Sequence, residues 1–137
     1  MARGIELNNP LNIKKSNNTW KGRVTPGKDS TFEEFHDKIW CYRAGFCIML
    51  SYFKRGIHTI HSIIHTWAPP KENDTQNYVQ FVSTYAGLGK FEVIDFFNKR
   101  LMCKIMSAMV QMEVGLTGED KTIAEAYDIM CKDKFNM

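Results

Sequence analysis

The sequence contains no apolar run of the roughly 18–20 residues that a membrane-spanning helix requires. Its first residues, Met-Ala-Arg-Gly-Ile-Glu, lack the apolar core of a secretory signal peptide. We therefore expect a protein that is made in the cytoplasm, with no membrane span and no signal peptide. Release from the cell would then use another route, such as lysis or packaging in a particle.

Cysteine is scarce and shows no functional pattern. The four cysteines form no CxxC pair and have no metal-ligand spacing. Each lies among apolar residues in a segment with helical periodicity, where a reduced cysteine behaves as a small hydrophobic residue. The pattern favours free thiols over a disulfide framework, which stays the less favoured alternative. The residues are Cys41, Cys47, Cys103 and Cys131.

Familiar catalytic motifs are also missing. There is no glycine-rich phosphate loop, no HExxH and no GxSxG. His58, His61 and His65 have the i, i+3, i+7 spacing that can in principle ligate zinc on one helical face. No cysteine or carboxylate on that stripe completes a site, so a solvated or rim-forming face is favoured. We expect neither a metal site nor a cofactor.

What is present is the composition of an ordinary globular chain. The 137 residues are 44% hydrophobic and 24% charged, which predicts one domain with a single core. The net charge of +3 is unevenly placed, because residues 1–28 carry six basic side chains against the carboxylate of Glu6 alone. A basic N-terminal arm can meet an anionic polymer, whether nucleic acid, lipid or cell-wall polymer. A solvated basic surface explains the same residues equally well.

Apolar periodicity predicts a mainly α-helical fold. The most apolar helix, about 38–54, is hydrophobic on nearly all sides and should lie in the middle of the domain. Arg43 is its one internal charge, so it should meet a carboxylate or backbone carbonyls. Asp37, Thr59 and Thr122 are expected as N-caps. The predicted helices span about 38–54, 59–66, 75–86, 92–114 and 122–132.

Residues 1–30 are different in character, being rich in Asn, Gly, Lys and Pro. Leu11–Ile13 and Thr19–Val24 alternate between apolar and polar residues, as short strands do. We expect a small N-terminal β-hairpin or an irregular lobe, attached to a helical core over 38–132. The predicted fold class is therefore mainly α (α+β), one domain of about five helices.

The corner at residues 67–78 holds more chemistry than a turn requires. A helical segment ends at Trp67, and Pro69–Pro70 prevent its continuation. Glu72 lies in this apolar setting, which could raise its pKa toward that of an acid able to protonate a glycosidic oxygen. A solvated corner residue is the alternative for Glu72. N-capping of the next helix is the favoured role of Asp74, and Glu6 is a third candidate carboxylate. A rigid Pro-Pro segment that braces two helices would explain the same residues.

The same corner and the N-terminal segment are rich in aromatic and amide side chains. Aromatic rings stack on sugar faces, and amides hydrogen-bond to hydroxyl and acetamido groups, so these residues suit a glycan-binding groove. For the N-terminal asparagines, a turn-forming role is the alternative. The candidate glycan-binding residues are Trp67, Tyr78, Trp20, Asn9 and Asn73.

Two strings carry a family resemblance. Residues 3–13 read RGxxxNNPxNI, and residues 67–78 read WAPPxENDTxxY. Together they resemble a family of small phage and prophage proteins, usually labelled virion structural proteins and related to the lysozyme-like superfamily. The resemblance covers about residues 3–90. It implies a lysozyme-like helical domain of a bacterial phage or prophage, associated with the virion and its other proteins.

A more distant similarity is to cell-wall glucosaminidases. In that group a catalytic Glu ends a helix and is followed by an Asn-Asn-x-x-x-Ile strand and a Trp-x-Gly turn. Residues 8–13 and Trp20-Lys21-Gly22 are similar to those elements. Only seven residues precede Asn8, which is too few for the helix that should present the acid, and Glu6 lies too close. The similarity implies the groove of the superfamily without its usual acid.

Three hypotheses follow, in decreasing order of preference. The first is a lysozyme-like phage protein that engages peptidoglycan or another glycan polymer. This hypothesis leaves open whether the protein cleaves β-1,4 glycosidic bonds; if it does, Glu72 is the acid, assisted by Asp74 or Glu6. The second is a non-catalytic virion structural or interaction protein that keeps the fold as a scaffold. Nucleic-acid binding by the basic N-terminal arm is the least favoured.

Overall fold

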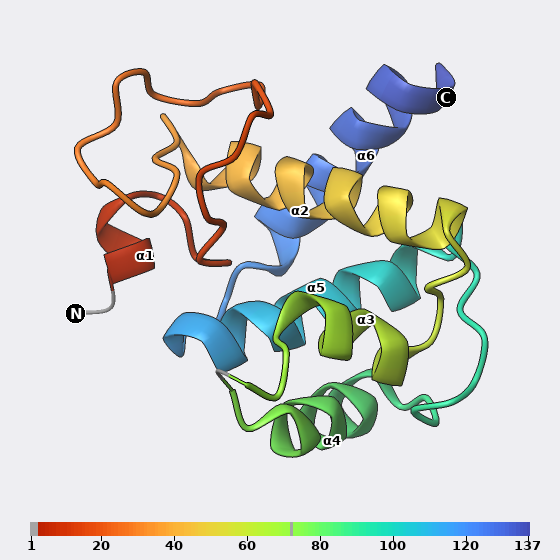
Figure 1. The fold of residues 1–137 in the computed structure, drawn as a ribbon. Helices are drawn as coiled ribbons and strands as arrows, with labels where there is room; N and C mark the ends of the chain where they lie inside the picture. Colours follow the sequence, from red (N-terminus) through yellow and green to blue (C-terminus); the bar gives the residue numbers. More distant parts are fainter. Residues whose placement is uncertain (1–2, 72) are drawn as a thin grey trace.

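The computed structural model describes residues 3–71 and 73–137 and is mainly α-helical, as predicted (Figure 1). Within those residues there are no strands, only two isolated bridges. Six helices are formed where five were expected, because the first, a single turn, was not anticipated. They are α1 (Arg3–Glu6), α2 (Lys38–Lys54), α3 (Ile60–Trp67), α4 (Thr75–Ala86), α5 (Lys99–Val114) and α6 (Asp120–Phe135).

Helix α2 lies between the other parts of the structure, as its apolar surface predicts (Figure 1). It begins at its expected cap, since Asp37 accepts a hydrogen bond from the Ile39 N–H at 3.1 Å. Gly45 marks a close approach on this helix. A Cβ at that position would lie 2.5 Å from Leu11 Cδ1 and 2.9 Å from Met106 Cε. The N-terminal segment and α5 therefore both pack against α2 at this glycine.

The turn between α3 and α4 is stabilised by its own side chains. The Thr75 hydroxyl donates to the Ala68 carbonyl at 2.6 Å, and the Asn73 amide donates to the Pro69 carbonyl at 3.1 Å. Asp74 accepts a hydrogen bond from the backbone N–H three residues later, at 3.3 Å, which confirms its predicted capping role. Much of the unusual composition of this corner is thus used to join two helices.

The predicted boundaries of the last two helices are wrong at their N-termini. Helix α5 begins at Lys99, not near residue 92, and its cap is Asn98. The preceding loop is turned by its own carboxylates: Glu92 accepts from the Gly89 N–H at 2.5 Å, and Asp95 accepts from the N–H two residues later at 2.9 Å. Local bonds of this kind compete with helix formation. Helix α6 begins at Asp120, two residues before the expected cap at Thr122.

Of the two alternatives expected for the N-terminal segment, the irregular lobe is confirmed among the described residues, and the hairpin between Leu11–Ile13 and Thr19–Val24 is not formed. The two segments do not pair with each other. Lys14, just after the first segment, and Arg23, near the end of the second, each form a bridge to the segment 32–35. The backbone explains this, because Asn12 has a φ of 54° and Gly22 a φ of 80°, which interrupt both extended runs. The bridges join Lys14 with Phe32 and Arg23 with Phe35. We call residues 3–37 the N-terminal lobe.

A buried asparagine organises this lobe. Asn9 is fully buried, and its amide nitrogen donates to the carbonyls of Ile13 and Glu33, both at 2.9 Å. Its amide oxygen accepts from the Ile13 N–H at 2.9 Å and from the Cys41 thiol at 3.3 Å. One side chain therefore joins residues 9–13 to the segment around Glu33 and to α2.

The apolar side chains of the lobe and of helices α2–α6 form one continuous core. Helix α2 packs chiefly on α6, and α4 on α5. Arg43 meets a carboxylate, as predicted, since its Nε donates to Asp133 Oδ2 at 2.8 Å. The four cysteines are free. Among the described residues, no helix is both long enough and apolar enough to cross a lipid bilayer.

Candidate functional site

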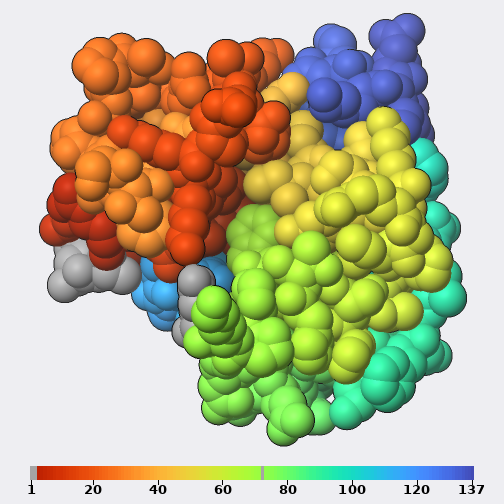
Figure 2. All heavy atoms as spheres, in the orientation of Figure 1, coloured from red at the N-terminus to blue at the C-terminus, as the bar shows by residue number. Residues whose placement is uncertain are grey.

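A groove of about 570 Å³ separates the N-terminal lobe from helices α2 and α3. Figure 2 shows the lobe, in red and orange, standing beside the yellow and green of these helices. Its lining combines polar, aromatic and aliphatic side chains. Its described lining comprises Leu11, Asn12, Ile13, Lys14, Ser16, Asn18, Trp20, Phe32, Ile48, Tyr52, Thr66, Trp67, Ala68, Pro69, Asn73 and Glu113.

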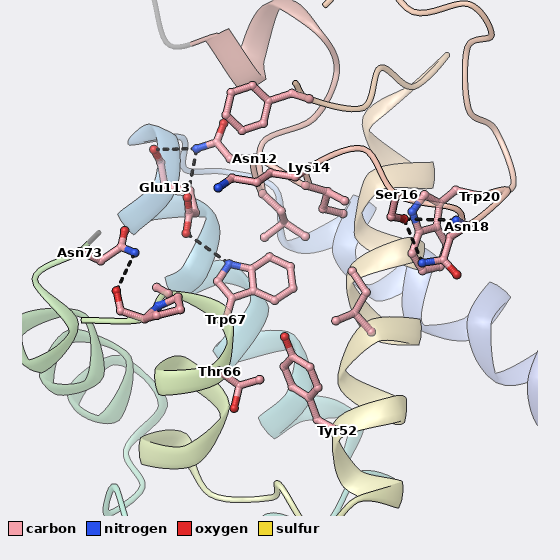
Figure 3. A pocket seen from close by; sticks show the side chains of 16 residues that line it. Asn12, Lys14, Ser16, Asn18, Trp20, Tyr52, Thr66, Trp67, Asn73 and Glu113 are labelled. Carbon is pink, nitrogen blue, oxygen red and sulfur yellow. Dashed lines mark hydrogen bonds between the residues drawn. The ribbon is translucent and has the colours of Figure 1, made fainter. Parts of the chain in front are cut away.

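Trp67 lies at the centre of the groove (Figure 3). It is the last residue of α3, and the prolines that follow prevent the helix from continuing over its ring. The indole is half-buried, and its Nε1 donates to Glu113 Oε2 at 3.3 Å. This bond fixes the plane of the ring, while one part of the indole stays accessible from the groove.

Glu113 joins the walls of the groove. It lies in the last turn of α5 and accepts hydrogen bonds from Trp67 Nε1 at 3.3 Å, from the Tyr78 hydroxyl at 3.0 Å and from Asn12 Nδ2 at 3.0 Å. Burial, with the nearby Glu113 charge, raises the pKa of Tyr78 well above its usual value, so this phenol stays protonated and can donate. A single carboxylate thereby links the lobe to α3, α4 and α5.

Sequence reasoning missed Glu113. The signal that was available is its position: a lone carboxylate following the apolar face of a long helix and placed just before Gly115. Nothing in the chain nearby indicates its partners, because Asn12, Trp67 and Tyr78 lie 101, 46 and 35 residues away.

Tyr52 adds a second aromatic group to the groove. It is placed there by α2, and in Figure 3 its hydroxyl points toward Trp67. Burial raises the pKa of Tyr52, with Arg55 opposing the effect, so the hydroxyl remains a neutral donor and acceptor. The opposite wall carries the side chains of Asn12, Ser16 and Asn18. Each wall thus combines aromatic and amide groups: Trp67 and Tyr52 with Asn73 on the helical side, and Trp20 and Phe32 with Asn12 and Asn18 on the lobe side.

Three of the five candidate glycan-binding residues come together here. Trp67, Trp20 and Asn73 all line the groove. Tyr78 is buried and positions Glu113 instead of facing the opening. Asn9 lies inside the lobe with its amide satisfied, so it does not reach the groove surface.

The candidate carboxylates are not brought together among the described residues. Glu6 is exposed and pairs with Arg3 at 3.0 Å, outside the groove. Asp74 caps α4 and lines a different hollow with His61 and His65. Glu72 lies outside the described residues. Within the described lining, Glu113 is the one carboxylate.

Of the three histidines in the predicted stripe, His61 and His65 lie together, whereas His58 lies elsewhere. His58 precedes the α3 cap and packs against Phe53, with ring centroids 6.4 Å apart. His61 and His65 stack on each other at 4.0 Å, and the His65 Nδ1 lies 2.8 Å from the His61 carbonyl. In the part of the chain that the structure describes, no group of three His, Cys, Asp or Glu side chains could hold a metal ion.

These features define a small, mainly α-helical protein with an open groove between an irregular lobe and a helical body. No protein-family model matches its sequence. Over 118 residues, however, it is 40% identical to protein P5 of Pseudoalteromonas phage PM2, across 83% of this chain and 72% of P5. The chain therefore belongs to the family of this phage protein, which confirms the resemblance to phage proteins. The likeness to the lysozyme-like superfamily stays a prediction.

Proposed function

We propose that the protein is a virion component of a phage or phage-derived element that binds glycan strands of peptidoglycan in its groove without cleaving them. Membership of the P5 family supports the phage origin and makes a virion role the natural expectation. The observation that supports glycan binding most directly is the groove itself, which is lined by the indoles of Trp67 and Trp20 and by the amides of Asn12, Asn18 and Asn73.

The lining suits a sugar chain. The groove volume, about 570 Å³, lies within the range of roughly 300–1,000 Å³ that is usual for ligand sites. Trp67, Trp20 and Tyr52 offer aromatic faces and a hydroxyl, whereas Asn18 and Asn73 offer amides for hydroxyl and acetamido groups. Both kinds of contact are needed, because a sugar ring has apolar faces and a polar edge.

The chemistry of Glu113 favours binding over cleavage. Glycoside cleavage requires a protonated acid and usually a second carboxylate. Three hydrogen bonds are donated to Glu113, by Asn12, Trp67 and Tyr78, so both of its carboxylate oxygens are occupied within the protein. We therefore assign Glu113 a positioning role, holding the indole of Trp67 in place.

Co-sedimentation with purified peptidoglycan tests this function. The wild type should sediment with the polymer, and Asn18→Ala/Asn73→Ala should weaken binding by roughly 5- to 100-fold, as expected for two lost hydrogen bonds. Both side chains are exposed and make only local bonds, Asn73 to the Pro69 carbonyl and Asn18 to the Ser16 hydroxyl, so the helices and the core should be retained. Asn17→Ala/Asn77→Ala, at exposed positions outside the groove, is the matched control. Sedimentation of both double variants like the wild type would remove the groove from the proposal.

Cleavage is the second candidate, favoured by the presence of a carboxylate in the groove and by the position of Glu72 in the Trp-Pro corner. The reaction would be hydrolysis or transglycosylation at a β-1,4 bond. Zymography with the wild type, Glu72→Gln and Glu113→Gln decides between the two functions. Clearing by the wild type that either substitution abolishes would replace the binding-only proposal. Asp74 and Glu6, engaged in capping and in an ion pair, would be assisting residues at most.

The virion role requires other virion proteins as partners, and it has its own test. Purified particles should contain the protein at a fixed copy number after washing in high salt. Its absence from particles, with accumulation only in infected cells, would contradict the role while leaving glycan binding intact.

A further inference from the structure

A second hollow, of about 470 Å³, adjoins the groove. Trp20 and Asn18 line both, so the two are neighbours across these residues. The remaining wall of this basic hollow is formed chiefly by Lys21, Arg43 and Lys134. Figure 3 shows the Trp20 end of the groove next to α2, the helix that carries Arg43.

The basic hollow has an excess of positive charge. Asp133 is the carboxylate that balances it in part: Arg43 Nε donates to its Oδ2 at 2.8 Å, and Lys21 Nζ lies 3.2 Å from the same oxygen. These two cations hold the pKa of Asp133 below its usual value, so the carboxylate stays ionised. Lys134 forms no ion pair with the described residues. Three cations therefore face one carboxylate.

Arg43 gives the hollow a rigid donor. Its side chain is only 10% exposed, because α2 and α6 pack around it. The bond from Nε to Asp133 fixes the guanidinium, and its η nitrogens make no hydrogen bond to the described part of the chain. A guanidinium held in this way is suited to bind a carboxylate or phosphate oxygen.

The simpler explanation is that Arg43 and Asp133 only connect α2 to α6, with solvated lysines nearby. Such a connection needs one cation, yet Lys21 and Lys134 come to the same place from the lobe and from α6. Arg43, which is buried, and Lys134, which is exposed, both line the hollow, so its positive charge is not confined to the outer rim.

We propose that the basic hollow is an anion subsite, which binds a carboxylate carried by the glycan that occupies the groove. This inference rests on the proposed function and deepens it. Peptidoglycan carries such groups, in its stem peptides and where a lactyl group is left without a peptide, whereas an uncharged polymer of N-acetylglucosamine does not. A strand stacked on Trp20 would place a side group within reach of Lys21, Arg43 and Lys134, and the subsite would thereby distinguish peptidoglycan from other amino-sugar polymers.

Calorimetric titration of the full chain with two ligands tests the inference. One ligand is an uncharged N-acetylglucosamine hexamer, and the other is a purified peptidoglycan fragment with free stem-peptide carboxylates. Lys21→Gln/Lys134→Gln should weaken fragment binding by about 2- to 30-fold, the range for two partly exposed charge pairs, and should reduce its salt dependence. Binding of the hexamer should not change.

The matched control is Lys54→Gln/Lys121→Gln, which removes the same charge from exposed positions outside both hollows. An equal loss of fragment affinity in this control, or no loss in Lys21→Gln/Lys134→Gln, would reject the subsite while hexamer binding upheld the proposed function. A wild type that binds neither ligand would reject both proposals. A third arm uses a single-stranded DNA oligonucleotide. If Lys21→Gln/Lys134→Gln loses DNA binding but keeps fragment binding, the hollow serves nucleic acid and the inference is wrong.

Discussion

The N-terminal lobe and the helical body, residues 38–135, are stabilised in different ways. In the lobe, side chains hydrogen-bond to the backbone: Asn9 binds three such groups, and Asp29 accepts from the N–H groups of Thr31 and Phe32 at 2.9 and 2.7 Å. In the helical body, apolar side chains spaced along α2–α6 fill one core. The lobe depends on the identity of a few polar residues, whereas the body depends on volume and periodicity.

The two walls of the groove should differ in the same way in their tolerance of substitution, because one wall comes from the lobe and the other from the helical body. The helical wall should tolerate substitutions that keep volume, and the lobe wall should not tolerate the loss of a single buried amide.

The largest effect is expected from Asn9→Leu. The substitution keeps the branched shape and the number of heavy atoms but leaves the Ile13 N–H and the Glu33 carbonyl without their partner, whereas the Ile13 carbonyl keeps the Glu33 N–H. Each buried group left unpaired costs on the order of 1–3 kcal/mol, so the free energy of unfolding should fall by about 3–5 kcal/mol. Urea denaturation measures this. Asn17→Ala, at an exposed position in the same lobe, should change stability by less than about 0.5 kcal/mol. Equal values for the two variants would contradict the role given to Asn9.

Glu113→Ala should have the next largest effect, because it removes the carboxylate that hydrogen-bonds both to the lobe and to the helical body. Asn12, Trp67 and Tyr78 lose their common acceptor. We expect a loss of about 2–3 kcal/mol in unfolding free energy. Backbone amide exchange around residues 12–14 should accelerate more than exchange within α2. Uniform acceleration throughout the chain would show that Glu113 does not act at the junction of lobe and body.

Met106→Leu tests the helical body with a single substitution at a buried position, as Asn9→Leu tests the lobe. Met106 is fully buried and packs near Gly45. Because apolar swaps of nearly equal volume are tolerated in cores, the loss should be less than about 1.5 kcal/mol. Thermal unfolding by circular dichroism measures it. A loss as large as that of Asn9→Leu would remove the distinction between the two regions.

The smallest effect, and one of opposite sign, is expected from Glu33→Gln in the lobe. Glu33 is 2% exposed and its Oε2 has no partner among the described residues. Burial raises its pKa, and the charges of Arg23 and Lys15 oppose this. The protonated form therefore stabilises the fold below the unfolded pKa of about 4.5, and that contribution is lost as the pH rises through the folded value.

Glu33→Gln should accordingly be more stable than the wild type at pH 7, by about 1 kcal/mol, the order of cost of one unpaired buried polar group. The difference should shrink below about pH 4.5, the unfolded value. Unfolding curves at pH 4 and pH 7 decide the matter. A variant that is less stable at pH 7 would show that the ionised carboxylate has a stabilising partner.

Much of the helical body could be predicted because periodicity and capping reflect local chemistry. Asp37, Thr59 and Asp74 were identified as caps from sequence and act as such. The start of α5 could not be predicted, since Phe96 continues the helical spacing while Glu92 and Asp95 fold the backbone into turns. Periodicity carries no information about such competing local bonds.

The candidate site was predicted only in part, for a related reason. Trp67, Trp20 and Asn73 line the groove, as a search for unusual aromatic and amide residues suggested. The same search selected Tyr78 and Asn9, because residue type does not reveal burial. Both are inside the protein and support the groove from behind.

The contact between Asn12 and Glu113 also bears on how the groove forms. The two residues are 101 positions apart, so the bond between them closes a loop that includes most of the chain. Contacts of such long range carry a high loop-closure entropy and slow folding in proportion to their share of the structure. During synthesis, the lobe and helices α2–α4 are made before Glu113 is added to the chain. The groove is consequently completed only after residue 113 has been made, by a side chain that joins segments made before it.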